Sequence, residues 1–134
     1  MSAACIFCKI IKGEIPSIKL FETAKTYAFA DIQPLSKGHA LVIPKEHAVK
    51  LHELSDESLA DLLPAAKKLA VAVGADEYNI LQNNGPMAHQ VVKHVHIHMI
   101  PKPNEEEGLK VGWPATNPEK DELAKYWESI KQKL

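Results

Sequence analysis

Several features that would place the chain in a specialised class of protein are missing from its sequence. No apolar run approaches the roughly 20 residues that a membrane-spanning helix requires. The first residues, MSAAC, lack the basic and apolar segments of a secretory signal. Basic and acidic side chains nearly balance, at 16 and 17, so charge alone predicts neither nucleic-acid nor membrane binding. We therefore expect a cytoplasmic protein, or one shared between cytoplasm and nucleus.

Cysteine is scarce, and the chain has only two such residues, Cys5 and Cys8. A disulfide between them is not expected in a reducing cytoplasm. A C-x-x-C pair supplies two of the four ligands of a structural zinc site, so the other two must come from elsewhere in the chain. The pair is therefore either half of a zinc site or two inert thiols.

Internal repeats, low-complexity tracts and linkers are also absent, and 134 residues with 46% hydrophobic content fit one domain over residues 1–134. Strands are expected at residues 18–22, 27–32, 38–44, 78–82 and 94–101, and helices at 6–12, 55–73 and 117–133. Strands in hairpin-like order with separate helices predict an α+β fold. We expect a five-stranded antiparallel sheet with a central helix and a C-terminal helix.

Local signals mark the expected helix ends and one loop. Ser55 is a typical N-cap for the central helix, and Pro64 predicts a kink inside that helix or a later start. Asn117 followed by Pro118 predicts the start of the terminal helix. The polar, acidic segment 103–112 is expected to be a mobile loop.

The most informative stretch is residues 94–100, HVHIHMI. Successive side chains of a strand point to opposite faces, so His94, His96 and His98 are predicted to share one face. Three rings with polar nitrogens fill a core poorly, which favours chemistry over packing. A neutral imidazole is both a nucleophile toward phosphorus and a common zinc ligand. The residues alone leave three interpretations open: a nucleophile, a set of zinc ligands, or incidental histidines on the surface of a strand.

The pattern His-φ-His-φ-His-φ-φ, with φ apolar, resembles the signature of the histidine triad family of nucleotide hydrolases and transferases. Four further stretches, residues 6–16, 29–32, 38–47 and 83–85, agree with this family in the same order. Residues 87–90 and 111–115 are similar to fungal-type members of its HINT branch. The resemblance covers residues 5 to about 114 and implies the histidine triad fold.

The resemblance implies a role for three histidines. His96 corresponds to the nucleophile that attacks the α-phosphorus of a nucleotide and becomes transiently nucleotidylated. His98 corresponds to the residue that hydrogen-bonds the α-phosphate, and His39 completes the hydrogen-bond chain behind the triad. The implied activity is hydrolysis of adenosine 5′-phosphoramidates of the AMP-NH2 or AMP-lysine type. The implied assembly is a homodimer.

The resemblance also implies contacts with a purine nucleotide. Asp31 corresponds to the carboxylate that accepts from the ribose hydroxyls; a turn aspartate before Pro34 is the alternative, and the family match favours the ribose role. The phosphate-facing edge corresponds to Asn83, Gln90 and the backbone around Val91. The apolar slot for the base corresponds to Phe7, Ile10, Ile15, Phe29 and Ile32, which core packing explains equally well.

Zinc-bearing members of the family suggest where the missing metal ligands lie. They imply a closed Cys2His2 site made of Cys5, Cys8, His47 and His94. His94 then holds a structural Zn²⁺, while His96, two residues along, carries out the chemistry.

Two positions depart from the HINT pattern. Val91 stands where a serine usually donates to the leaving group or phosphate, and His89 stands where glycine is common. One alternative is therefore a nucleotide-binding sensor with vestigial activity. Another is a dinucleoside polyphosphate hydrolase of the fragile-histidine-triad branch, although Asn83 replaces the glutamine typical there. Nucleotidyl transfer to an acceptor other than water is a weaker third alternative.

Overall fold

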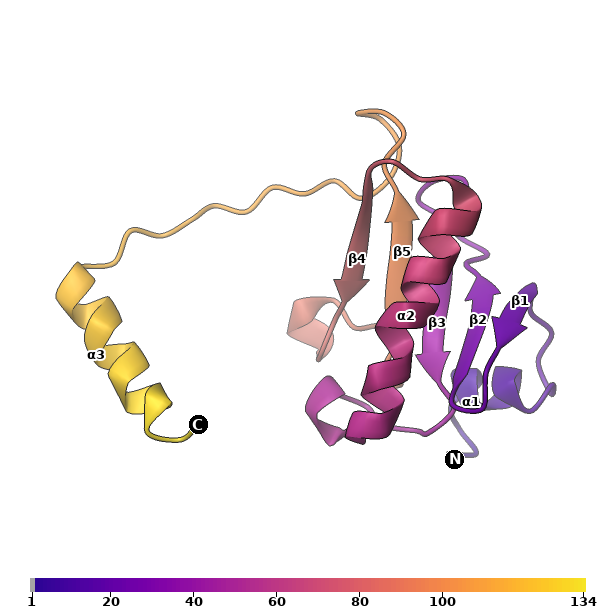
Figure 1. Cartoon of the computed structure of the whole chain (residues 1–134), viewed down its shortest axis with the longest axis horizontal. Helices are drawn as coiled ribbons and strands as arrows, with labels where there is room; N and C mark the ends of the chain where they lie inside the picture. Colours follow the sequence, from indigo (N-terminus) through magenta and orange to yellow (C-terminus); the bar gives the residue numbers. More distant parts are fainter. Residues whose placement is uncertain (1) are drawn as a thin grey trace.

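The computed structural model describes residues 2–134 and contains an antiparallel sheet of five strands (Figure 1). The strands are β1 (Lys19–Glu22), β2 (Thr26–Ala30), β3 (Ala40–Pro44), β4 (Tyr78–Gln82) and β5 (Ile97–Pro101). Their order in the sheet is β1-β2-β3-β5-β4, so β5 lies between β3 and β4. This order places His98 of β5 opposite Leu41 of β3, close to His39, which directly precedes β3.

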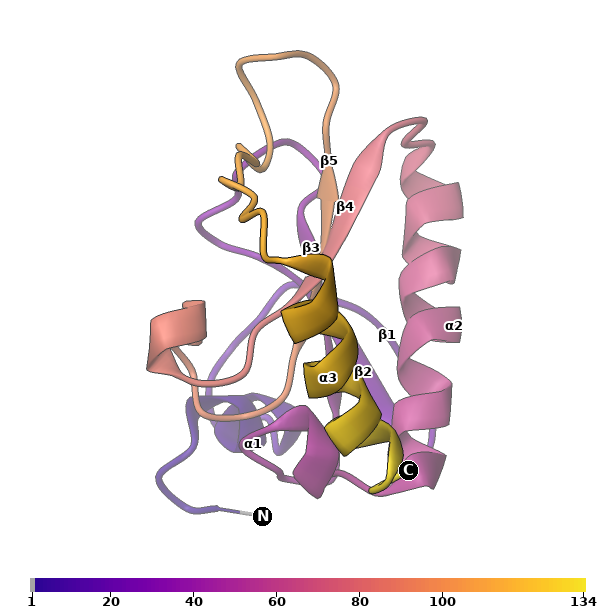
Figure 2. The same ribbon diagram turned by 90° about the vertical axis from the view of Figure 1, so that its left-hand side faces the viewer.

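Two helices cover opposite faces of the sheet (Figure 2). Helix α2 (Asp56–Val73) packs its buried face on Val42, Val95 and Met99. Helix α1 (Ile6–Ile11) lies on the other face, where Phe7 packs with Phe29. The remaining helical elements are α3 (Lys120–Lys131) and two short 3-10 turns, Leu51–Glu53 and Pro86–Ala88.

The structure confirms the predicted α+β class, the five strands and the central helix. The Ser55 hydroxyl caps α2 by accepting a hydrogen bond from the Ser58 N–H at 3.2 Å. Pro64 lies inside α2 without ending it. It is on the exposed side of the helix, where water can satisfy the carbonyl that has lost its N–H partner.

Two predicted starts are wrong by three residues, and the other boundaries differ by at most two residues. Strand β5 begins at Ile97 instead of His94, because the Val95 N–H donates to Ala48 O at 2.8 Å, in the loop after β3. Helix α3 begins at Lys120, after an N-cap at Glu119, and not at Asn117. Pro118 disfavours helical backbone at the residue before it, which explains why the chain stays extended there.

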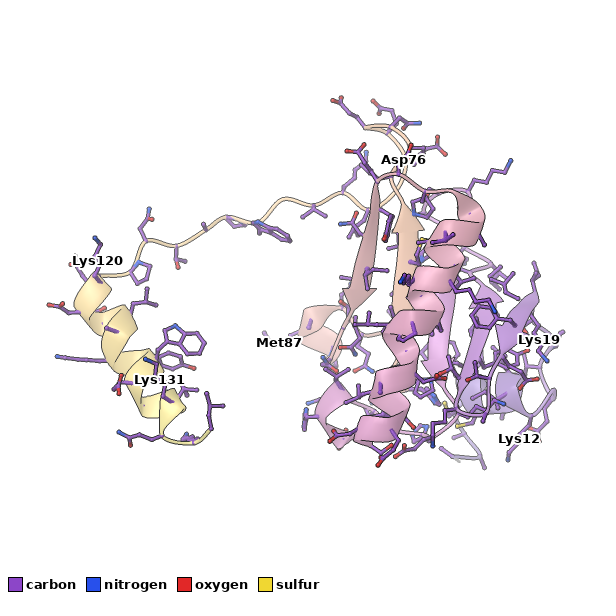
Figure 3. All side chains as sticks on the ribbon, viewed as in Figure 1. Lys12, Lys19, Asp76, Met87, Lys120 and Lys131 are labelled. Carbon is purple, nitrogen blue, oxygen red and sulfur yellow. The ribbon has the colours of Figure 1, made fainter. Side chains whose placement is uncertain are left out.

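The last 26 residues, 109–134, form a C-terminal arm that leaves the sheet near β4 (Figures 1 and 2). No residue of α3 is buried, and the side chains between Lys120 and Lys131 lie clear of the rest of the molecule (Figure 3). Trp113, Tyr126 and Trp127 of this arm are 82%, 58% and 53% exposed. Among the described residues, no helix has the length and apolar character needed to cross a membrane.

Candidate active site

His39, directly before β3, and His98 of β5 form a hydrogen-bonded pair of rings. The Leu35 N–H donates to Nδ1 of His39 at 3.0 Å, so the neutral ring carries its proton on Nε2. That Nε2 lies 2.9 Å from Nδ1 of His98 and 3.4 Å from Oδ2 of Asp31. His98 therefore accepts at Nδ1 and keeps its own N–H on Nε2, available as a donor.

His96 is held in the opposite tautomer. Its Nδ1 lies 2.7 Å from the backbone carbonyl oxygen of His94, and because a carbonyl only accepts, Nδ1 carries the proton. The Nε2 lone pair of His96 is left free. The rings of His96 and His98 meet edge-on, 5.0 Å apart between centroids, so the ring with the free nitrogen neighbours the ring that carries an Nε2–H.

The surroundings keep these rings uncharged. Burial lowers the pKa of both His39 and His96 below the ordinary value for histidine. Burial, reinforced by the neighbouring His96 and His39 rings, lowers the pKa of His98 to about 4. At neutral pH His96 is thus a free base. The arrangement is suited to nucleophilic attack on an electrophile whose negative charge is met by an adjacent donor.

The loop between β4 and β5 is braced by the side chain of Gln90. Its Oε1 accepts from the Gly85 N–H and its Nε2 donates to Val49 O, each at 2.7 Å. Gln90 was predicted at the phosphate-facing edge, but both ends of its amide are used inside the protein. The structure therefore places Gln90 beneath the loop, as a support for it.

The other predicted phosphate-facing residues lie on the surface of this loop. Asn83 donates to His89 O at 3.3 Å, and Val91 is 80% exposed. His89 has a φ of 70°, the one positive φ of a non-glycine residue in the described part of the chain. A left-handed backbone favours glycine, which gives a physical reason for the family preference at that position.

The predicted base-binding residues divide into buried and exposed ones. Phe7, Ile10 and Phe29 are at most 7% exposed and pack in one cluster, with Ile15 partly buried against it. Ile32 is separate from them and 82% exposed. Oδ1 of Asp31 accepts from the Gln33 N–H at 2.8 Å, as in the turn that the sequence also suggested, while Oδ2 faces His39.

Cys5, Cys8, His47 and His94 converge as the resemblance implied, with their ligand atoms all within 4.8 Å of one another. Sγ of Cys5 lies 3.4 Å from Nδ1 of His94, and Sγ of Cys8 lies 3.4 Å from Nδ1 of His47 and 3.7 Å from Nδ1 of His94. The two Nδ1 atoms are 3.1 Å apart. A tetrahedral zinc with bonds of about 2.3 Å to sulfur and 2.0 Å to nitrogen has S···N edges of about 3.5 Å and N···N edges of about 3.3 Å. The four side chains therefore fit a zinc ion.

The tautomer of His94 agrees with a role as metal ligand. Its Nε2 lies 2.8 Å from Pro44 O and so carries the proton, which leaves the Nδ1 lone pair facing the thiols.

Asp31, His39 and His98 also place ligand atoms within 4.8 Å of one another. There, however, Nδ1 of His39 accepts a hydrogen bond from the Leu35 N–H, and its Nε2 carries the proton shared with His98, so His39 has no lone pair left for a metal. That cluster is a hydrogen-bond relay.

Phe7 connects the two histidine clusters. Its ring meets those of His94 and His96 edge-on, at centroid distances of 5.8 and 5.1 Å. Sequence reasoning assigned Phe7 either to the base slot or to core packing, and predicted no contact with the histidine rings. It also missed the backbone groups that set the ring tautomers, namely the N–H of Leu35 and the carbonyls of Pro44 and His94. Backbone partners leave no residue signature, so the sequence holds no signal for them.

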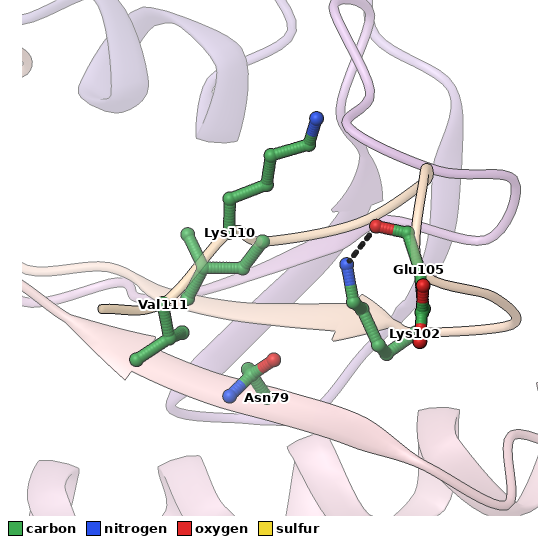
Figure 4. A pocket seen from close by; sticks show the side chains of 6 residues that line it. Asn79, Lys102, Glu105, Lys110 and Val111 are labelled. Carbon is green, nitrogen blue, oxygen red and sulfur yellow. Dashed lines mark hydrogen bonds between the residues drawn. The ribbon is translucent and has the colours of Figure 1, made fainter.

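A hollow of about 410 Å³ lies elsewhere, between β4 and the start of the C-terminal arm (Figure 4). Asn79, Lys102 and Val111 line it, and Lys102 Nζ donates to Glu105 O at 3.1 Å. None of its lining residues belongs to the histidine and cysteine clusters described above.

The site is typical of enzymes that use histidine for catalysis. It combines a buried histidine that has a free ring nitrogen, a neighbouring N–H donor and a Cys2His2 cluster. The family model for the HIT domain matches residues 12–105, and the chain belongs to this histidine triad family. It is 62% identical over 131 residues to an adenosine 5′-monophosphoramidase of Schizosaccharomyces pombe, covering 98% of each chain.

Solved structures show the same likeness. A crystal structure of a histidine triad nucleotide-binding protein from Candida albicans is 54% identical, with a TM-score of 0.93 over 97% of this chain and 96% of that one. A zinc-bound histidine triad family protein from Mycobacterium smegmatis is 32% identical, with a TM-score of 0.73 over 94% of this chain and 97% of that one.

Proposed function

We propose that the protein hydrolyses adenosine 5′-phosphoramidates through a nucleotidyl-histidine intermediate. The observation that carries the proposal is the free Nε2 of His96, fixed by the 2.7 Å hydrogen bond from Nδ1 to His94 O. A full-length relative at 62% identity is an adenosine 5′-monophosphoramidase, which supports this substrate class.

In the proposed reaction, Nε2 of His96 forms a bond to the α-phosphorus as the phosphorus–nitrogen bond breaks, and the departing nitrogen takes a proton from solvent water to leave as the amine. Water then attacks the nucleotidyl-histidine, releasing AMP and restoring the free ring. The chain contains no arginine, so no guanidinium can hold the phosphate in a bidentate grip. We assign the phosphate charge to the Nε2–H of His98 and to backbone N–H groups of the loop before β5.

Steady-state turnover of adenosine 5′-phosphoramidate and a diadenosine triphosphate, measured side by side, tests this function. We expect preference for the phosphoramidate. Preference for the diadenosine substrate would move the protein to the dinucleoside polyphosphate hydrolases. Binding of AMP without turnover of either compound would instead support a nucleotide sensor, the alternative that the exposed Val91 favours by offering no hydroxyl.

We also propose that Cys5, Cys8, His47 and His94 hold a structural zinc ion. Four protein ligands leave no open coordination position, so the ion would join α1 to the segment before β5 without taking part in turnover. The edge lengths of the cluster and the zinc-bound relative support this proposal. Metal analysis of the purified protein tests it, with one zinc per chain expected.

We further propose a homodimer. Trp113, Tyr126 and Trp127 are exposed on the C-terminal arm, and β4 is an edge strand with Tyr78 and Ile80 43% and 42% exposed. The Candida albicans structure matches 97% of this chain, including most of the arm, at a TM-score of 0.93. Sedimentation of the full chain should give a dimer, whereas Trp127→Ser with Tyr126→Ser should weaken it. A monomeric wild-type chain would contradict the proposal.

A further inference from the structure

A pocket of about 460 Å³ is lined by Cys5 and His47 of the Cys2His2 cluster and also by part of the loop before β5. Val91 and Lys93 are among the lining residues from that loop. Cys5 is partly exposed, whereas Cys8 behind it is fully buried. A small solute therefore reaches one thiol of the pair through this pocket but not the other.

The two thiols are close enough to react with each other. Cys5 is the N-cap of α1, and its Sγ accepts a hydrogen bond from the Cys8 N–H at 3.4 Å. The two Sγ atoms belong to the set of ligand atoms within 4.8 Å of one another. A disulfide requires an S–S distance of about 2.05 Å, which side-chain rotation within one C-x-x-C pair can supply.

We propose that Cys5 and Cys8 form a peroxide-sensitive oxidation site whose disulfide form expels the metal and disturbs His96. This inference rests on the zinc site proposed above, and it uses the proposed hydrolase activity for only one readout. The chain has no other cysteine, so all of its thiol chemistry takes place at this pair.

The chemistry balances with hydrogen peroxide as the oxidant. The Cys5 sulfur attacks one peroxide oxygen, the O–O bond breaks, and a sulfenic acid and water result. The Cys8 sulfur then attacks the Cys5 sulfur, the S–O bond breaks and a second water leaves. Two thiols and one peroxide thus give one disulfide and two waters, with two electrons passing from sulfur to oxygen. A dithiol reductant returns the two electrons.

Loss of the sulfur ligands affects the position of the His96 ring through two contacts. The first is the backbone of His94, whose ring is a ligand and whose carbonyl holds the Nδ1 proton of His96 at 2.7 Å. The second is Phe7, which lies between the cysteines in α1 and packs edge-on against both rings. A change in either contact alters the position or the tautomer of the nucleophile.

The test treats zinc-loaded protein with hydrogen peroxide and follows four quantities: free thiols, zinc released to a chromogenic chelator, the ¹⁵N NMR signals of the His96 ring, and phosphoramidate turnover. We expect two thiols and one zinc to be lost together. The Nδ1–H signal of His96 should shift, and turnover should fall by roughly tenfold or more. Dithiothreitol followed by zinc should restore all four quantities.

Cys5→Ser and Cys8→Ser are matched controls, because neither variant can form the intrachain disulfide, and mass spectrometry under non-reducing conditions should find that disulfide in the wild-type protein alone. Zinc release with an unchanged His96 signal would overturn the link to the nucleophile. Oxidation to sulfinic acid without a disulfide would overturn the oxidation site. If reduced, zinc-loaded protein lacks turnover, the proposed function fails, yet thiols, zinc and NMR still decide this inference.

Discussion

His94 and His96 are two residues apart, both are buried, and the rings of both touch Phe7, yet the structure assigns them different chemistry. His94 donates its Nε2 proton to Pro44 O and turns Nδ1 toward two thiols. His96 donates its Nδ1 proton to His94 O and leaves Nε2 free. The difference is which nitrogen faces a carbonyl.

A carbonyl oxygen can only accept, so each one fixes the proton of the ring that it meets. The remaining lone pair faces the two thiols in His94 and is left free in His96. Burial favours the neutral form in both cases, lowering the pKa of His94 to about 4 and also lowering that of His96. Backbone geometry thus separates a ligand from a nucleophile without any change of residue type.

The largest expected effect comes from His96→Ala. Loss of the only nitrogen proposed to bond phosphorus should reduce turnover by at least about a thousandfold. The fold and AMP binding should be retained, because the neighbouring strands and Phe7 stay in place. Single-turnover assays and calorimetric titration with AMP measure the two quantities, and substantial residual turnover would remove His96 as the nucleophile.

Cys8→Ser should act mainly on stability. Without one thiolate the site loses zinc affinity, and the metal no longer links α1 to the segment before β5. We expect the melting temperature to fall by roughly 10 °C, a larger effect on stability than on room-temperature activity. Calorimetry with and without a chelator is the measurement. Equal melting points for chelated and untreated wild-type protein would contradict a structural metal.

Alternation and capping signals predicted the sheet and α2 well, because both depend on side chains that the sequence displays. Tyr78–Gln82 and the Ser55 cap match the structure. The start of β5 could not be predicted, since it depends on a hydrogen bond from Val95 to Ala48, which is distant in the sequence. Long-range backbone pairing overrides the local pattern there.

The residues that make up the site could be predicted from the sequence, whereas the protonation and hydrogen-bond partners of their atoms could not. The family pattern brought together Cys5, Cys8, His47 and His94, and the structure confirms that they converge. The pattern also placed Gln90 at the phosphate-facing edge, where its amide turns out to be used twice inside the protein. The histidine tautomers and the hydrogen bonds of Gln90 depend on backbone N–H and C=O groups. Every residue type has these groups, so the sequence does not reveal such contacts.

Depressed histidine pKa values predict the pH dependence. The folded-state pKa of His98 is about 4, below the ordinary 6.5, so the unfolded chain binds more protons between these values. The stability contribution is therefore fully present above pH 6.5 and is lost as pH falls toward 4. The acidic limb of kcat/KM should likewise lie below pH 6.5. Denaturant titrations and rate profiles from pH 4 to 8 check both, and a limb centred at or above 6.5 would contradict a buried neutral His96.

The smallest expected effect is that of Val91→Ser. Val91 is 80% exposed on the loop before β5, so the exchange removes no core packing and should leave the melting temperature unchanged. A serine hydroxyl there can donate to the leaving amine or the phosphate, which the valine cannot do. We expect kcat for the phosphoramidate to rise by roughly threefold to tenfold, the worth of about one hydrogen bond. Val91→Thr is the matched control, because it adds the hydroxyl while keeping the branched shape, and it should raise kcat in the same direction. A lower kcat in both variants would show that His98 and the loop amides already supply the donors that the reaction needs.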